Sequence, residues 1–242
     1  MFELSFSAVS VPDVLAFMWF VFCWGGYGFV ADRIQYKRRE MAQVAHGLRV
    51  KWMLRMLNNE NRMPDITIVV AHIRSGSLFV STSLLITAGV VALLGNVSRV
   101  RQVLSELSFA ANPTTFSVEI KTFLLLAVFV YAFFKFAWCL RQYNYSLVLI
   151  GAAPKTEQLE NHAAAVGYAE RVARVLSRAA MTFNRGLRSY YFGLAMLMWF
   201  VQPILFAAGS VIVLMVLYRR DFHSNTLDAL AGDVNSSGHV GV

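Results

Sequence analysis

Four apolar stretches, each about as long as a bilayer is thick, constrain the fold of this 242-residue chain most. About 20 helical residues, rising about 1.5 Å each, cross roughly 30 Å of hydrocarbon. The stretches cover residues 11–30, 77–95, 120–140 and 189–218. A composition that is 57% hydrophobic exceeds what the core of a soluble domain can bury. The sequence therefore predicts an all-α membrane protein with four transmembrane helices.

The ends of the hydrophobic region set the expected domain limits. The first stretch has no basic segment just before it and no small-residue cleavage site, so we expect a retained span rather than a signal peptide. The last stretch would be about 45 Å long if straight, so a tilt or a break at Pro203 is expected to shorten it. We expect one helical membrane domain over residues 1–225 and a disordered tail over 226–242, which is small and polar.

The distribution of lysine and arginine predicts the orientation, because positively charged loops resist translocation. Residues 33–74 contain nine of them and residues 141–188 contain seven, whereas residues 99–121 contain three. Both long connections are therefore expected in the cytoplasm, with both termini outside it. The pair Arg219 and Arg220 conflicts with this topology, and the tail would move inside if the fourth stretch did not fully cross. A multi-pass protein of a bacterial inner membrane fits this pattern.

Both long connections contain amphipathic helical patterns. The first, near residues 33–57, is predicted either to lie in the membrane interface or to pack on neighbouring helices. In the second connection, arginines and apolar residues lie on two different faces of one predicted helix. The arginines are Arg171, Arg174, Arg178 and Arg185, and the apolar residues are Ala165, Ala169, Val172, Leu176, Ala179 and Phe183. Because the bases are interrupted by apolar segments, anionic headgroups are the expected partner and nucleic acid is not.

Lys135 lies among aromatic residues in the third stretch and has two interpretations. Its long stem can carry the ammonium to the cytoplasmic interface. Alternatively, it forms a positive vestibule, because the acids near the spans, Asp13 and Glu119, lie at the opposite boundary. The second interpretation predicts a polar site for anions or lipid made of Lys135, Arg141, Gln142, Asn144, Asn184, Arg185 and Arg188.

Other sequence features favour packing over chemistry. The glycines of WGGYGF, residues 24–29, end a hydrophobic helix, so close helix packing explains them better than an ion filter. Cys23 and Cys139 are expected to act as small hydrophobes. The five histidines show no zinc-binding spacing, and no phosphate-binding or nucleophile motif is present. We therefore expect no catalytic residues, no metal, no cofactor and no enzyme activity.

Three stretches together resemble an uncharacterised family of membrane proteins, domain of unknown function 599. They are LRVKWMLRML with SLFVSTSLL, then YAFFKFAWCLRQYNYSLVLIGAAP, then FNRGLRSYYFGLA through LYRRDFHS. The resemblance covers approximately residues 15–225 and implies the four-span topology, but no reaction, substrate or catalytic residue. Asp221 departs from the glutamate expected at that position of the family.

Two functions are expected from these patterns. The first is an oligomeric transport or pore component that favours anionic solutes or lipid headgroups. The alternative is a non-catalytic accessory or scaffold subunit of a membrane complex. A bundle this small seldom encloses a pathway alone, so a homo-oligomer or a larger complex is expected. Water along the Lys135 face would favour the first function, and a dry face the second.

Overall fold

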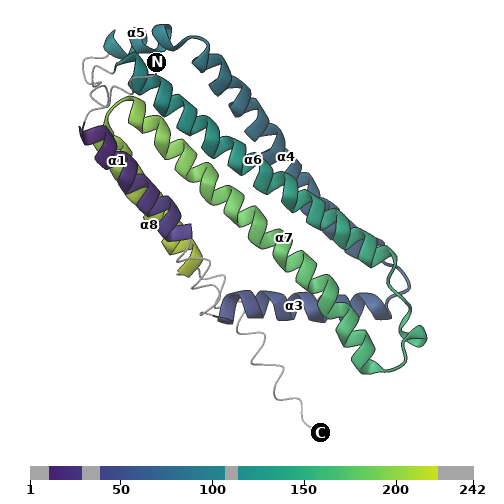
Figure 1. Ribbon diagram of the computed structural model, residues 1–242. Helices are drawn as coiled ribbons and strands as arrows, with labels where there is room; N and C mark the ends of the chain where they lie inside the picture. The colour runs from purple at the N-terminus through teal and green to yellow at the C-terminus, as the bar shows by residue number, and fades with distance from the viewer. Residues whose placement is uncertain (1–10, 29–38, 107–113, 223–242) are drawn as a thin grey trace, which may run out of the picture. The chain divides into compact units, whose positions relative to one another are not determined.

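The computed structural model describes residues 11–28, 39–106 and 114–222, and nearly all of these residues are helical with no strand among them (Figure 1). The all-helical prediction is therefore confirmed. The helices are α1 (Val11–Val21), α3 (Arg39–Asn58), α4 (Met63–Leu94), α5 (Val97–Glu106), α6 (Thr115–Gly151), α7 (His162–Leu197) and α8 (Pro203–Phe222). A π-helical turn, Phe22–Gly26, continues α1, and short 3-10 turns cover Thr156–Gln158 and Met198–Phe200. The predicted disordered tail, 226–242, lies outside the described residues.

Two of the described helices, rather than four, are long and apolar enough to cross a membrane. These are α4 and α6, with 32 and 37 residues. At about 1.5 Å per residue both exceed the roughly 30 Å of a hydrocarbon core. Helix α1 with its π-helical turn and helix α8 are apolar but shorter. The first and last predicted spans therefore do not meet the length criterion as single helices.

The last apolar stretch is not one helix, so the prediction of a single span over 189–218 is wrong. Helix α7 ends at Leu197, and α8 begins only at Pro203, which confirms the expected break. Proline lacks the amide that would continue the helical hydrogen bonds. A Cβ placed on Gly209 of α8 would lie 3.8 Å from the Cβ of Ala195 of α7. The chain therefore turns back after the break, and α8 packs along the helix that precedes it.

The chain forms two compact units, and α4, α6 and α7 each run from one into the other. Of the described residues, unit 1 contains 11–28, 81–106, 114–133 and 186–222. Unit 2 contains 39–80 and 134–185. The prediction of one helical membrane domain over residues 1–225 stays a prediction.

Unit 1 has a core of aromatic side chains. Helix α1 packs against α8 (Figure 1), and the ring centroids of Phe20 and Phe206 are 5.2 Å apart. Trp199, in the turn before α8, stacks on Phe206 at 4.9 Å. On α7, a Cβ at Gly193 would lie 3.0 Å from the ring of Phe129, so the missing side chain lets α6 and α7 approach closely. These contacts join apolar side chains of α1, α6, α7, α8 and the turn before α8 in one core.

The glycines of the WGGYGF motif have no such neighbour. A Cβ placed on Gly25, Gly26 or Gly28 would meet no atom within 4 Å among the described residues. Close helix packing within this part of the chain therefore does not account for them. Gly25 and Gly26 lie instead in the π-helical turn Phe22–Gly26, a feature that glycine tolerates because it has no side chain to crowd, and Gly28 follows that turn.

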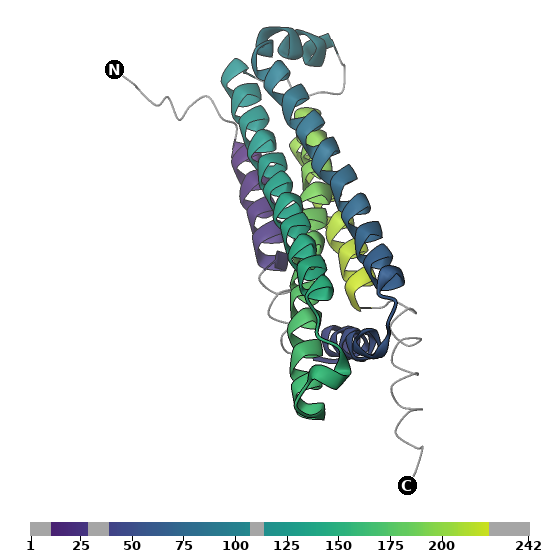
Figure 2. The same ribbon diagram turned by 90° about the vertical axis from the view of Figure 1, so that its right-hand side faces the viewer.

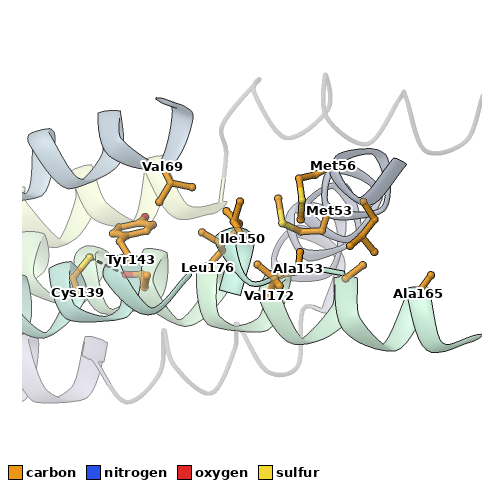
Figure 3. Packing of buried hydrophobic residues seen from close by; sticks show 14 residues of the cluster. Met53, Met56, Val69, Cys139, Tyr143, Ile150, Ala153, Ala165, Val172 and Leu176 are labelled. Atoms are coloured by element: carbon orange, nitrogen blue, oxygen red, sulfur yellow. Dashed lines mark hydrogen bonds between the residues drawn. The ribbon is translucent and has the colours of Figure 1, made fainter. Parts of the chain in front are cut away.

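Unit 2 is built where α3 crosses the other helices of that unit. Helix α3 runs across α7 in Figure 1 and is seen nearly along its axis in Figure 2, so the two helix axes are steeply inclined. Figure 3 shows Met53 and Met56 of α3 packed with residues of α6 and α7. Both methionines are fully buried. A helix with this crossing and this apolar face packs on its neighbours, which was one of the two interpretations left open.

The first half of α7 has the two faces that the sequence predicts. Its apolar face is buried in unit 2, namely Ala165, Ala169, Val172, Leu176 and Ala179, with Phe183 half-buried. The arginines of the opposite face are exposed, namely Arg171, Arg174, Arg178 and Arg185. The prediction of an amphipathic helix is therefore confirmed.

Candidate functional sites

The predicted site residues on α6 do not converge on one point. Lys135 is half-buried and has an interaction partner, so it is not the unpaired cation that the sequence suggested. The exposed Arg141 donates a hydrogen bond from Nε to the hydroxyl of Tyr145, 2.8 Å away, and so turns along its own helix. Asn144 is exposed. The Oε1 atom of Gln142 is buried and has no hydrogen-bond partner among the described residues.

The predicted residues on α7 lie in different surroundings. Arg185 is exposed in unit 2. Arg188 is buried in unit 1, where its guanidinium lies 5.7 Å from the ring centroid of Tyr27. Asn184 is half-buried in unit 2. Of the seven predicted residues, Asn184 alone lines the cavity described next.

Unit 2 contains a small cavity of about 170 Å³. Its lining comes from α3, α4, α6 and α7, and consists of Arg49, Trp52, Val69, His72, Tyr143, Leu176, Ala180, Phe183 and Asn184. Basic, hydroxyl, indole and amide groups are present, and none of the nine residues is acidic. His72 is exposed, so the cavity can be reached from the surface of this unit.

Arg49 is the fixed positive charge of this cavity, which we call the Arg49 cavity. Its Nη1 donates a hydrogen bond of 3.2 Å to Oγ of Ser177, and Nδ1 of His46 lies 3.1 Å from the same oxygen. Among the described residues, no carboxylate lies within 4.0 Å of its guanidinium. Burial lowers the pKa of Arg49 from its usual value, and nearby Tyr143 partly opposes this shift. The cation is thus partly desolvated, and the described part of the chain places no acidic counterion beside it.

The other polar groups of the cavity divide into engaged and open ones. Nε1 of Trp52 donates to the buried carboxylate of Asp65 at 2.6 Å. Nδ1 of His72 lies 2.8 Å from the backbone carbonyl oxygen of Ile68, one turn earlier in the same helix. The hydroxyl of Tyr143 has no hydrogen-bond partner among the residues that the structure describes, although the residue is only 6% exposed. Figure 3 shows this side chain next to Val69, another lining residue.

Unit 1 contains a second polar site, a buried ion pair. Nζ of Lys121 lies 2.8 Å from Oδ1 of Asp13, and both residues are buried. Nε1 of Trp199 donates to the same Oδ1 at 2.8 Å, and Oγ of Ser117 donates to Oδ2 at 3.4 Å. We call this group the Asp13–Lys121 pair. Its donors satisfy a carboxylate that burial would otherwise make unfavourable.

The ion pair also completes the chain reversal after α7. In a continuous helix the carbonyl of Trp199 would accept from the amide of residue 203, but Pro203 has no amide hydrogen. Nζ of Lys121 instead donates to this carbonyl at 3.3 Å. The lysine joins α1, α6 and the turn before α8.

Sequence reasoning missed both sites, although each had a detectable sign. Asp13 and Lys121 have opposite charge and lie at the same predicted boundary of their apolar stretches, which is unusual enough to suggest a pair. The Arg49 cavity had a weaker sign. Arg49 and Tyr143 both belong to stretches that carry the family resemblance, but nothing in their spacing places them together.

No group of three or more histidine, cysteine, aspartate or glutamate side chains in the described part of the chain is arranged to hold a metal ion. The expectation that the protein has no metal or cofactor stays a prediction. A family model described as "Protein of unknown function, DUF599" matches residues 15–226. No curated protein and no solved structure matches the chain.

Proposed function

The chain belongs to the family of proteins of unknown function DUF599, which supplies no role, and we propose one from the residues of this chain. It is a multi-pass membrane protein that binds anionic lipid. The expected binding surface is the basic unit 2, on the cytoplasmic side of the membrane. In this role the protein organises lipid as a non-catalytic component of the membrane. The observation that carries this proposal is the contrast between an exposed apolar α4 and an exposed arginine face on α7.

Helix α4 supports the membrane part of the proposal. Only 11% of the most apolar 18-residue window of this helix is buried. A core helix of a soluble protein would be mostly covered by its own chain, whereas lipid covers the exposed apolar side chains of a span. Leu78 and Leu85 of this helix are 69% and 73% exposed. Lipid is the environment that suits such a helix.

The charges of unit 2 support the lipid-binding part. Residues 43–80 and 134–185 contain twelve lysines and arginines but five aspartates and glutamates. A cytoplasmic location of this unit agrees with the positive-inside rule. In this proposal α8, which turns back after α7, leads Arg219 and Arg220 toward the cytoplasmic side, as the positive-inside rule favours.

Site-specific labelling tests the membrane topology. Single cysteines are introduced at Glu60, at Glu157 and at Asn96, and a membrane-impermeant thiol reagent is applied to sealed vesicles of known orientation. The proposal expects Glu60→Cys and Glu157→Cys to react from one side and Asn96→Cys from the other. The native Cys23 and Cys139 are buried, which limits background labelling. Equal reaction of all three from one side would refute the proposal.

Lipid binding is tested with the arginine face of α7. Each cation near an anionic surface contributes about 1 kcal/mol, so removing two should weaken the preference for anionic lipid by about 30-fold. The measurement is the ratio of phosphatidylglycerol to phosphatidylcholine retained by the purified protein, for Arg174→Gln with Arg178→Gln. The matched control is Arg99→Gln with Arg101→Gln, two exposed arginines of α5. Equal retention by both variants would contradict a specific role for unit 2.

Anion permeation between copies of the chain is a second candidate function. It is favoured by the face of α6 that contains Lys135, because Tyr131 and Trp138 on this face are 40% and 51% exposed. A second copy packed there would place Lys135 along the contact. Chloride flux into liposomes is expected to fall for Lys135→Met and to stay unchanged for Lys155→Met, an exposed lysine in the loop before α7. Equal flux for both variants would exclude this candidate.

A further inference from the structure

The Arg49 cavity has the features of a small anion site. A buried or half-buried cation is stable when a counterion or several dipoles face it. Among the described residues Arg49 has one hydrogen-bond partner, the neutral hydroxyl of Ser177, which occupies one of the five N–H donors of its guanidinium. The remaining donors have no carboxylate in reach among the described residues. An anion entering the cavity would supply the missing charge.

Two further polar groups of the cavity lack partners in the described part of the chain. They are the hydroxyl of Tyr143 and the side-chain amide of Asn184. Neither group is among the fully buried side-chain atoms that lack a hydrogen-bond partner, so both remain accessible to water or to a ligand in the cavity. Both groups can donate to an oxygen, as the guanidinium does. The cavity therefore presents donors from α3, α6 and α7 toward one small space.

The size and the chemistry of the cavity select the ligand. Ligand pockets for drug-sized molecules have volumes of about 300–1,000 Å³, and this cavity has about 170 Å³. A single compact group with several oxygen acceptors fits better than a large molecule. Arginine is well suited to phosphate, because its planar donors can bind two oxygens at once. The absence of acidic lining residues removes a source of repulsion.

We infer that the Arg49 cavity binds one phosphoryl group, carried by a lipid headgroup or by a soluble phosphate. The lipid form of this inference rests on the proposed function, because it requires the cavity to lie at a membrane surface. The soluble form does not. Arg49 supplies the charge, and Tyr143 and Asn184 supply directed hydrogen bonds to the phosphoryl oxygens.

Binding to the purified full-length protein in nanodiscs of phosphatidylcholine tests this inference. The probes are inorganic phosphate and a short-chain phosphatidic acid, each measured by calorimetry. Loss of a charge-assisted contact is expected to weaken binding by about tenfold or more for Arg49→Gln. Tyr143→Phe, which keeps the ring, is expected to weaken it about threefold to tenfold. Arg55→Gln is the matched control, because Arg55 is exposed on the same helix and does not line the cavity.

Each outcome of this test is decisive. Binding of both probes, with loss in the Arg49 and Tyr143 variants, assigns a phosphoryl site open to soluble phosphate. Binding of phosphatidic acid alone, with the same losses, assigns a headgroup site. Binding of neither probe, or equal losses for Arg49→Gln and Arg55→Gln, overturns the inference. The α7 arginine variant tests the proposed function separately. If that variant retains less phosphatidylglycerol while the Arg49 cavity binds neither probe, the proposed function stands and only the inference about the cavity fails.

Discussion

Replacing Lys121 by methionine should test whether the Asp13–Lys121 pair is shielded from water. Lys121 is 4% exposed and Asp13 is 7% exposed, and their charged atoms lie 2.8 Å apart. At that distance two unit charges attract by about 6 kcal/mol at an effective dielectric constant of about 20, but by only about 1.5 kcal/mol in bulk water. Lys121→Met leaves the carboxylate buried without its cation, which should lower the free energy of unfolding by about 3–5 kcal/mol.

The assay is an unfolding titration with sodium dodecyl sulfate in mixed micelles, followed by tryptophan fluorescence. Asp13→Asn with Lys121→Met removes both charges, so the double variant should be more stable than the Lys121 variant alone. Lys155→Met, at an exposed position, should change the free energy of unfolding by less than about 0.5 kcal/mol. The reasoning fails if Lys121→Met costs under about 1 kcal/mol, because a solvated pair would then be indicated.

Three further substitutions probe packing and hydrogen bonds. Gly193→Ala should destabilise the protein by about 1–3 kcal/mol, because the new Cβ would lie 3.0 Å from the buried ring of Phe129. Gly89 has open space around it, so Gly89→Ala is the control and should be neutral or stabilise by up to about 1 kcal/mol in the same unfolding titration. Arg62→Met removes the donors to three backbone carbonyls near the end of α6, so amide hydrogen exchange should become faster there. Arg62→Lys should restore protection only in part, because lysine lacks the planar set of donors. Unchanged exchange in Arg62→Met would contradict this role. Trp52→Phe removes the hydrogen bond to the buried carboxylate of Asp65, so it should lower stability by about 1–3 kcal/mol and lower the melting temperature. A melting temperature equal to that of the parent protein would show that water replaces the indole.

The helical content of this chain is predictable because its signs are local. Apolar runs of sufficient length and the alternation of faces on α7 depend on residues within a few turns of one another. The turn back after α7 is only partly local. Pro203 indicates a break, but the direction of α8 also depends on the packing of Phe206 against Phe20, which lies at the other end of the chain. A hydropathy pattern therefore merges α8 and the end of α7 into one apparent span.

The candidate sites were harder to predict for the same reason. The seven residues were grouped because the sequence predicts them near one boundary of the membrane, but a shared depth alone does not bring side chains together. Arg49 and Tyr143 are far apart in the chain, and the crossing of α3 over the other helices of unit 2 makes both of them line one cavity. The identity of such neighbours follows from tertiary packing, which a single sequence without an alignment does not contain.

The hydrogen bond between Trp199 and Asp13 has a consequence for biogenesis. These residues are 186 positions apart, and Ser117, another donor to the same carboxylate, is 104 positions away. At about 5–20 residues synthesised per second, the ribosome completes Trp199 about 10–40 s after Asp13. During that interval the carboxylate of Asp13 exists without the side chains that donate to it in the folded protein, Ser117, Lys121 and Trp199. The packing of the first helix into unit 1 is therefore expected after translation of most of the chain.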